Sequence, residues 1–302
     1  MEFCRAMMIS EVADGIYAID TEVGGEKGIV FSFIVDRGEV AIVETGAEST
    51  SGIFSEVFEE LGINPERVKY IAVTHVHLDH SGAAGSLVRI CEKAKVVVHP
   101  RGAEHLVNPE RLWRASKSVL NEVAEVYGKP LPIDESRIIV SEDNSEYSLG
   151  ESKIKVVHTP GHAPHHQSFV IDKILFPGDS AGVYKDGHVI PTTPPVFNFE
   201  KAVESIRKMR KLNVEKIAYT HFGVGEKDML DKIEEKLFEW KKLAFSCESV
   251  EGMHEKLLEV DEDYKFLWEW LKKSRFAESY FHLALRGFME AVKNEVELRY
   301  DK

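Results

Sequence analysis

The stretch Thr74-His75-Val76-His77-Leu78-Asp79-His80 predicts both the fold and the chemistry of this chain. An apolar run at residues 68–73 precedes it and is typical of a buried strand, and a helical pattern follows over residues 82–90. The cluster is therefore expected at the carboxyl end of a strand, where open α/β sheets place their ligands. Helix capping needs only one Asp or Ser, so three histidines in this position indicate a metal site instead.

The composition predicts a folded protein with a sizeable core. The chain has 302 residues, of which 43% are hydrophobic, and a large α/β domain with a smaller appendage is expected. The formal net charge is −13, which disfavours nucleic acid as a partner because nucleic-acid binders usually present a basic face. No apolar run is long enough to span a bilayer, so we expect no contact with a membrane.

The cysteines indicate a reducing compartment. Cys4, Cys91 and Cys247 are odd in number and far apart, and there is no Cys-x-x-Cys motif. Residues 1–10 lack the apolar core of a signal peptide. We therefore expect a cytoplasmic protein with free thiols and without a cysteine zinc site.

The predicted elements change character near residue 225. Strands are predicted at 15–20, 29–35, 39–43, 68–73, 95–99, 138–140, 153–158, 168–171, 174–176 and 216–219. Helices are predicted among them at 49–61, 82–90, 109–127 and 201–212. After this point only helices are predicted, at 228–245, 253–260, 263–273 and 278–297. We therefore divide the chain into residues 1–224 and a helical domain, residues 225–302.

Three later strand ends repeat the layout of the opening cluster, with an apolar strand followed by a turn residue beside His or Asp. His162 follows the strand at 153–158, Asp179 the strand at 174–176, and His221 the strand at 216–219. A single histidine at a strand end is usually an ordinary loop residue. Four such positions suggest that the side chains converge on one rim of a folded sheet.

These side chains have the composition of a site for two metal ions. The predicted ligands of one ion are His75, His77 and His162, and those of the other are Asp79, His80 and His221. Asp179 is expected to bridge the two ions with its two oxygens. Imidazole and carboxylate ligands suit zinc, our first expectation, and also iron or manganese. Two ions about 3.5–4 Å apart lower the pKa of a bridging water, which becomes a hydroxide nucleophile.

The pattern His75-x-His77-x-Asp79-His80, with His162, Asp179 and His221, resembles the metallo-β-lactamase superfamily over roughly residues 12–224. The resemblance implies an α/β fold, the αββα sandwich of two mixed sheets with helices outside and a dinuclear site along one edge. It also implies that Asp79 assists proton transfer to the leaving group. The layout of a metal domain followed by an all-helical C-terminal extension is similar to glyoxalase II.

Two positions depart from the motifs of this superfamily. Relatives usually carry Asp-Thr-Gly where this chain has Glu44-Thr45-Gly46, so the resemblance implies that Glu44 supports the ligands from outside. Relatives often read Gly-His-Thr-Pro-Gly-His where residues 161–166 read Gly-His-Ala-Pro-His-His. His165 thus replaces a glycine. We predict it as a second catalytic candidate beside Asp79, either a proton donor or a substrate contact, with an exposed loop histidine as the alternative.

The substrate pocket is less legible in the sequence than the metal site. Tyr184, Phe197 and Phe222 flank the metal segments and are our candidates for lining it. We expect the helices of residues 225–302 to cover the mouth of the active site and to select a small-molecule substrate.

The predicted activity is hydrolysis of a thioester, a lactone or a phosphodiester by a dinuclear metal enzyme. One alternative is a mononuclear iron dioxygenase acting on persulfides, because such relatives of glyoxalase II resemble this chain at the positions of His75, His162 and Asp179. The other alternative is a metal-binding regulator without catalysis. The sequence leaves a homodimer open.

Overall fold

The computed structural model describes residues 8–300, and its first layer is a mixed sheet. Within these residues, seven strands pair in the order of the sequence. They are β1 (Ile9–Ala13), β2 (Ile16–Asp20), β3 (Phe31–Arg37), β4 (Glu39–Val43), β5 (Val68–Ala72), β6 (Lys95–Val98) and β7 (Ile138–Val140). The strands from β1 to β4 are antiparallel, joined between β3 and β4 by the predicted hairpin, and those from β4 to β7 are parallel.

The second layer is a six-stranded mixed sheet in the order β15-β14-β11-β10-β9-β8. Its strands are β8 (Glu146–Leu149), β9 (Ser152–His158), β10 (Gln167–Ile171), β11 (Ile174–Phe176), β14 (Lys216–Ala218) and β15 (Val224–Glu226). β9 and β11 are both antiparallel to β10, and β14 is parallel to β11. The carboxyl ends of β9, β11 and β14 therefore point the same way.

Alternating side chains explain why the two sheets pack face to face. In β4, Ala41 and Val43 belong to the core between the sheets, whereas Val40 and Ile42 belong to the core under the outer helices. Successive strand residues point to opposite faces, so both faces of a buried strand must be apolar. Between the sheets, Phe33 meets Phe176 with ring centroids 5.2 Å apart.

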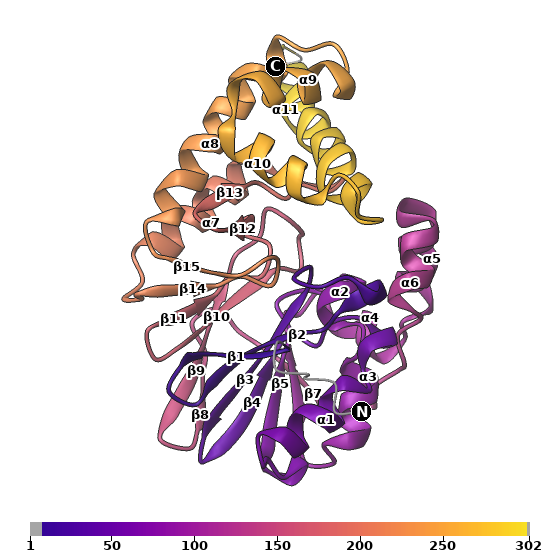
Figure 1. The fold of residues 1–302 in the computed structure, drawn as a ribbon, viewed down its shortest axis with the longest axis vertical. Helices are drawn as coiled ribbons and strands as arrows, with labels where there is room; N and C mark the ends of the chain where they lie inside the picture. The colour runs from indigo at the N-terminus through magenta and orange to yellow at the C-terminus, as the bar shows by residue number, and fades with distance from the viewer. Residues whose placement is uncertain (1–7, 301–302) are drawn as a thin grey trace, which may run out of the picture.

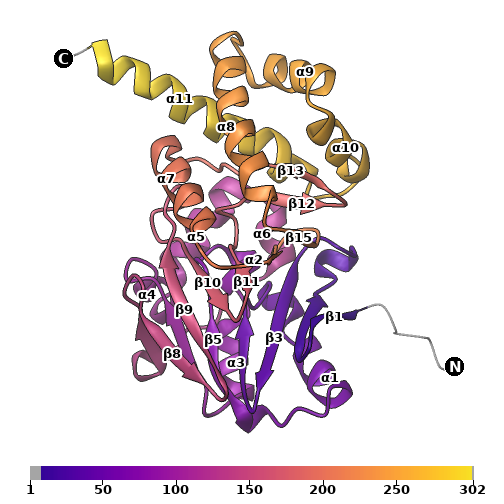
Figure 2. The same cartoon turned by 90° about the vertical axis from the view of Figure 1, so that its left-hand side faces the viewer.

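Helices cover the outer faces of both sheets (Figures 1 and 2). On the first sheet lie α1 (Ile53–Glu60), α2 (Leu78–Ser81), α3 (Ala84–Ile90) and α4 (Ala103–Val107), and on the second lies α7 (Phe199–Arg210). Short 3₁₀ turns occur at η1 (Val23–Gly25), η2 (Glu48–Thr50), η3 (Pro65–Arg67) and η4 (Glu135–Arg137). The predicted sandwich of two mixed sheets with helices outside is thus confirmed.

The helix predicted over residues 109–127 is wrong in one respect, because it is broken in two. α5 (Glu110–Leu120) and α6 (Glu122–Tyr127) meet at Asn121, whose φ of 51° and ψ of −121° are not helical. Asn accepts a positive φ more readily than most residues, so the apolar periodicity continued across a turn. The break packs α6 against α2, which carries part of the histidine cluster.

The C-terminal region is helical, as predicted, and stands above the sandwich in Figure 1. It consists of α8 (Met229–Phe245), α9 (Val250–Val260), α10 (Glu262–Leu271), the π-helical turn η5 (Ser279–Leu283) and α11 (Ala284–Tyr300). A hairpin of β12 (Val183–Lys185) and β13 (His188–Ile190) packs against α8 and α10. The domain division at residue 225 stays a prediction, and β15 crosses it.

Five strands were absent from the sequence prediction. They are β1, β8, β12, β13 and β15. β12, β13 and β15 are three residues long, and β1 and β8 lie at sheet edges with polar residues on their exposed faces. Such strands lack the apolar run or the clear alternation on which strand prediction depends.

The two cysteines in the described part of the chain, Cys91 and Cys247, are free and buried, and Cys4 lies outside it. In residues 8–300 every helix is too short or too polar to cross a membrane. The cytoplasmic location stays a prediction.

Candidate metal centre

Four segments bring the predicted ligands to one rim of the sandwich, at the carboxyl ends of β5, β9, β11 and β14. These side chains are His75, His77, Asp79 and His80 after β5, His162 after β9, Asp179 after β11, and His221 after β14. The chain is extended through His77 and becomes helical at Leu78, so Asp79 and His80 stand in the single turn of α2. This turn packs the His80 ring against His75, with centroids 4.0 Å apart, and brings Asp79 and His80 together with His221.

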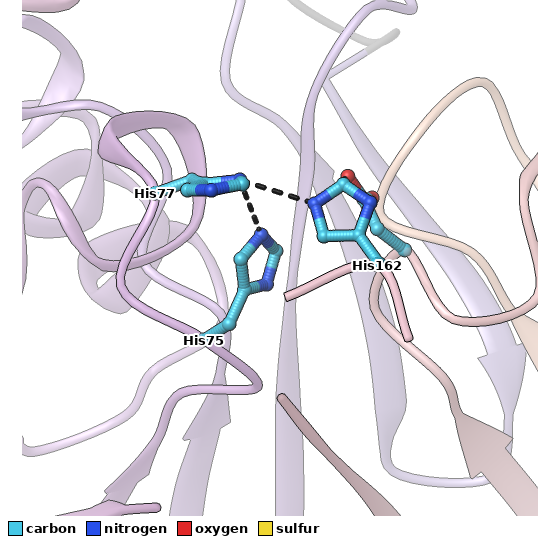
Figure 3. A group of neighbouring side chains, drawn as sticks. His75, His77 and His162 are labelled. Atoms are coloured by element: carbon cyan, nitrogen blue, oxygen red, sulfur yellow. Dashed lines mark hydrogen bonds and ion pairs between the residues drawn. The ribbon is translucent and has the colours of Figure 1, made fainter. Parts of the chain in front are cut away.

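The first group comprises His75, His77, His162 and Asp179, whose candidate ligand atoms all lie within 4.8 Å of one another. His77 Nδ1 is 2.8 Å from His75 Nε2 and 3.1 Å from His162 Nε2 (Figure 3). Asp179 Oδ2 is 3.3 Å from His162 Nε2. Three imidazoles and one carboxylate oxygen thus converge on one point.

The second group comprises Asp79, His80 and His221, also within 4.8 Å of one another. The Nε2 atoms of His80 and His221 are 3.2 Å apart. Asp179 Oδ1 lies 3.4 Å from His80 Nε2 and 3.3 Å from His221 Nε2. The two oxygens of Asp179 therefore face the two groups separately. The bridging of two ions by Asp179 stays a prediction.

Backbone carbonyls determine which ring nitrogen of two histidines carries the proton. His162 Nδ1 is 3.0 Å from the carbonyl oxygen of Thr192, and His221 Nδ1 is 3.0 Å from that of Ile29. A carbonyl only accepts hydrogen bonds, so each Nδ1 must donate. The neutral rings then direct the lone pair of Nε2 into the centre, which is the tautomer that binds a metal.

Glu44 holds the outer side of the second group. Its Oε1 accepts from the Thr74 hydroxyl and lies 3.1 Å from His80 Nδ1, and its Oε2 accepts from the Thr74 backbone N–H at 3.3 Å. Glu44 is buried and has a φ of 61°, an uncommon conformation for a residue with a side chain. With His80 Nδ1 donating to this carboxylate, the lone pairs of His80 Nε2 and His221 Nε2 face each other, an arrangement that a cation between them stabilises.

The electrostatics of the first group favour neutral imidazoles. Burial, followed by the neighbouring imidazoles, lowers the pKa of both His75 and His77 well below the ordinary histidine value. Neutral imidazole is the form that coordinates a metal.

The second group favours positive charge. Burial lowers the pKa of His80, but the carboxylates of Asp179, Glu44 and Asp79 outweigh it and raise the pKa well above the ordinary value. Burial raises the pKa of Asp179, but His80 and two further imidazoles outweigh it and lower the pKa well below the ordinary value. Within the described residues, Asp179 Oδ1 is buried without a hydrogen-bond partner. Imidazole lone pairs around such an oxygen fit a divalent cation of the zinc, iron or manganese type.

His165 lies beside the first group and is not the exposed loop histidine of our alternative. Its ring is half-buried and stacks on His75 with centroids 6.1 Å apart, and it meets His77 edge-on at 5.8 Å. Burial, helped by the imidazoles of His162, His105 and His99, lowers the pKa of His165 to about 4. In the described part of the chain, its Nδ1 is buried without a hydrogen-bond partner.

The three pocket candidates have different surroundings. Tyr184 stacks on Tyr219 with centroids 5.1 Å apart and has no ring contact with a predicted ligand among the described residues. Phe197 lines a cavity of about 10 Å³ together with His162 and Asp179.

Phe222 is buried at the junction with the C-terminal region. It packs between Trp270, 4.8 Å away, and Tyr280, 5.0 Å away, measured between ring centroids. Phe197 and Phe222 thus lie beside the cluster, whereas Tyr184 meets it through its backbone N–H, which donates to the carbonyl oxygen of His221 at 3.3 Å.

Two tyrosines at the centre were missed by the sequence analysis. The hydroxyl of Tyr280 is 2.8 Å from His221 Nδ1, and the hydroxyl of Tyr127 is 3.5 Å from Asp79 Oδ2. Both are buried. Neither is a neighbour in sequence of a predicted ligand, and no local motif distinguishes them from core tyrosines, so only the folded chain brings them to the site.

Comparisons with known proteins show which family model and which relatives resemble this chain. Residues 25–221 match the family model of the metallo-beta-lactamase superfamily. A metallo-beta-lactamase fold-containing protein of Sulfurisphaera tokodaii, ST1585, is 36% identical over 171 residues, which are 55% of this chain and 65% of that protein. The crystal structure of ST1585 superposes with a TM-score of 0.70 at 26% identity, covering 91% of this chain and 98% of that one.

Two further relatives carry the names of hydrolases. An N-acyl homoserine lactonase of Azorhizobium caulinodans, AttM, is 29% identical over 158 residues, 50% of this chain and 55% of that protein. An atrochrysone carboxyl ACP thioesterase of Aspergillus fumigatus is 25% identical over 173 residues, 57% of this chain and 43% of that protein. By sequence, the chain thus spans less than two thirds of the length of each of these curated relatives.

Proposed function

The chain belongs to the metallo-β-lactamase superfamily, and from this premise we propose that it is a hydrolase that uses two divalent metal ions to cleave an ester-like bond in a small molecule. The observation that carries the proposal is the shared carboxylate of Asp179, whose two oxygens face two separate groups of imidazoles. The lactonase and the thioesterase among the relatives support an ester-like bond as the target.

Each predicted ligand has a part in this proposal. His75, His77 and His162 would hold the first ion, and Asp79, His80 and His221 would hold the second. Asp179 would contribute one oxygen to each, and Glu44 keeps His80 in place from behind. Two bound ions supply Lewis acidity and lower the pKa of a shared water. Zinc is the first candidate, and iron and manganese suit the same nitrogen and oxygen ligands.

Two side chains are placed to handle protons and substrate. The Asp79 side chain is 15% exposed, compared with 6% for Asp179, so Asp79 is the more accessible of these two carboxylates. We assign it proton transfer to the leaving group. His165 is partly exposed beside the first group, and we assign its ring a hydrogen bond to a substrate oxygen. A neutral imidazole suits this role, because one ring nitrogen carries a proton that it can donate.

Substrate selection is assigned to the segments around the rim. Phe197 and Phe222 lie near the ligands, and the helices from α8 to α11 form the cap, to which the turn η5 contributes Tyr280. The proposal leaves three kinds of ester-like bond as candidate targets, namely a lactone, a thioester and a phosphodiester.

The test combines metal analysis with a substrate panel. Protein purified without added metal is analysed for zinc, iron and manganese, and assayed with a lactone, a thioester and a phosphodiester. We expect two ions per chain and turnover of at least one class, lost with chelator and restored by zinc. One iron per chain with oxygen uptake on a persulfide would instead establish the dioxygenase alternative. Full metal content without turnover of any class would favour the regulator.

The role of His165 is tested separately by His165→Ala. We expect turnover to fall by about 100-fold with both ions retained, because a positioned donor contributes roughly 10²–10⁴-fold. His105→Ala is the matched control, since its ring lies 6.3 Å from His165 and, among the described residues, has no ring contact with the first group. Loss of an ion in His165→Ala would make His165 a ligand, and wild-type turnover would remove it from the mechanism.

A further inference from the structure

The hydroxyl groups of Tyr280 and Tyr127 lie between two predicted ligands of the second group, His221 and Asp79. Tyr280 Oη lies 2.8 Å from His221 Nδ1, and Tyr127 Oη lies 3.5 Å from Asp79 Oδ2. The two tyrosine hydroxyls also influence each other's pKa, which indicates that they are neighbours. The three segments that meet here are distant in sequence. They are the end of α6, the turn η5 and the loop after β14, and they meet α2, which carries Asp79.

The direction of the hydrogen bonds among these side chains follows from the two ligands at the ends. His221 Nδ1 carries a proton because it also donates to the carbonyl oxygen of Ile29, so Tyr280 Oη must accept from it. The Tyr280 proton is then free to be donated to Tyr127. Tyr127 in turn donates its proton to the Asp79 carboxylate, because an ionised carboxylate can accept hydrogen bonds but cannot donate them. Each donor thus points from His221 towards Asp79.

The backbone at Tyr280 is arranged for this contact. Residues Ser279–Leu283 form a π-helical turn immediately before α11, and such turns often occur at functional sites. The turn places the Tyr280 ring edge-on to His221, with centroids 5.1 Å apart. Tyr127 is held on the opposite side by stacking on Phe276 at 5.6 Å.

We propose that Tyr280 and Tyr127 are positioning residues of the second metal group, and that the C-terminal helical region is thereby a structural part of that site and not only its cover. The inference rests on the proposed two-metal site. Tyr280 holds the His221 ring with Nε2 directed inward, and Tyr127 holds Asp79 in the orientation that directs its carboxylate to the same ion. The alternative is that both rings only fill space, Tyr280 against Phe222 and Tyr127 against Phe276.

Tyr→Phe substitutions separate these two roles, because phenylalanine keeps the ring and removes the hydroxyl. The full-length variants Tyr280→Phe and Tyr127→Phe are titrated with zinc against a competing chelator. We expect one of the two binding steps to weaken by about tenfold, the lower end for outer-shell partners of a metal ligand. The other step should stay within about twofold.

Tyr264→Phe is the matched control. Tyr264 is buried in the same helical region, and its hydroxyl bonds His254 at 2.6 Å, outside both metal groups. Both zinc steps should match wild type in this variant. With chelator in excess, the thermal midpoints of the site variants should match that of the control. Unchanged zinc binding in Tyr280→Phe and Tyr127→Phe overturns the inference, and so does an equal loss at both steps or in the control.

Combined variants test whether Tyr280 acts through His221. In a His77→Ala background, where the first group is damaged, Tyr280→Phe should still weaken the remaining site by about tenfold. In a His221→Ala background it should cause no further loss. An equal loss in both backgrounds overturns the inference. The number of zinc ions bound by the wild type tests the two-metal proposal separately, and that proposal fails if the wild type binds only one. In that case, a Tyr280→Phe variant that binds this one zinc with wild-type affinity overturns the present inference as well.

Discussion

The metal centre and the C-terminal helical region both bury carboxylates, but they balance the negative charge differently. In the metal centre, Asp79, Asp179 and Glu44 are surrounded by imidazoles and hydroxyls, and among the described residues no lysine or arginine pairs with them. The helical region instead contains two aspartates paired with two lysines. We call this set, Lys232, Lys236, Asp261 and Asp263, the lysine–aspartate cluster.

The lysine–aspartate cluster satisfies its charges within the protein. Lys236 Nζ is 2.6 Å from Asp261 Oδ1 and 2.8 Å from Asp263 Oδ2, and Lys232 Nζ is 2.9 Å from Asp263 Oδ1. Trp240 donates its indole N–H to the other oxygen of Asp261. Asp261 also caps the start of α10 by accepting from two backbone N–H groups. The cluster therefore fixes α10 to α8 without an external ion.

The comparison shows what distinguishes a structural cluster of buried charges from a site that receives a cation. In the lysine–aspartate cluster every carboxylate meets an ammonium group. In the metal centre, the Nε2 atoms of His80 and His221 face each other beside Asp179 Oδ1, which has no hydrogen-bond partner among the described residues. In our proposal, bound cations would complete the charge balance there. Substitutions in the metal centre should affect metal binding, and substitutions in the lysine–aspartate cluster should affect the free energy of unfolding.

The largest effect is expected from Asp179→Ala. This variant removes the carboxylate that faces both groups, so zinc binding and turnover should fall by more than about 100-fold, since outer partners alone cost roughly 10–100-fold. The fold should be retained, because the lysine–aspartate cluster is untouched. Zinc titration, turnover and circular dichroism measure these outcomes. Wild-type metal content and rate would show that Asp179 is not a shared ligand.

The next effect is expected from Lys236→Met. Removing the ammonium group leaves two buried aspartates with less positive charge, so the free energy of unfolding should fall by about 3 kcal/mol. Zinc stoichiometry should not change. Lys153→Met is the control: it breaks an ion pair with Glu146 that is 62% and 43% exposed and is expected to cost under about 1 kcal/mol. If Lys236→Met instead released zinc, the lysine–aspartate cluster would contribute to metal binding, and its assignment to stability alone would be wrong.

The smallest effect is expected at acid pH, where protonation of Asp263 should lower the free energy of unfolding. Burial raises its pKa, but Lys232, Lys236 and His188 outweigh burial and lower it below the ordinary value. The unfolded chain therefore binds this proton first, and the stabilisation present above about pH 4 is lost as the pH falls through the folded-state pKa.

This loss is isolated by comparing wild type with Asp263→Asn. Urea unfolding from pH 5 to pH 3, with chelator present throughout, should show a shallower decline of stability in the variant. Parallel declines in the two proteins would mean that Asp263 contributes no pH dependence.

The ligand positions were predictable because each one follows an apolar strand directly. A strand that is buried on both faces has a strong sequence signal, and the polar residue at its end stands out against it, as His162 and Asp179 do. The break at Asn121 was not predictable, because the apolar periodicity of α5 continues into α6. The π-helical turn at Tyr280 was equally hidden within a helical pattern.

The sequence by itself determined the family, the sandwich and the candidate ligands, because these depend on local alternation and on short motifs at strand ends. Only the tertiary structure decided which oxygen of Asp179 faces which group, which ring nitrogen of each histidine points inward, and that Tyr127 and Tyr280 meet at Asp79 and His221. These features depend on contacts between segments as far apart as α6 and η5. Such contacts arise from the packing of the whole chain and leave no periodic signal in any one segment.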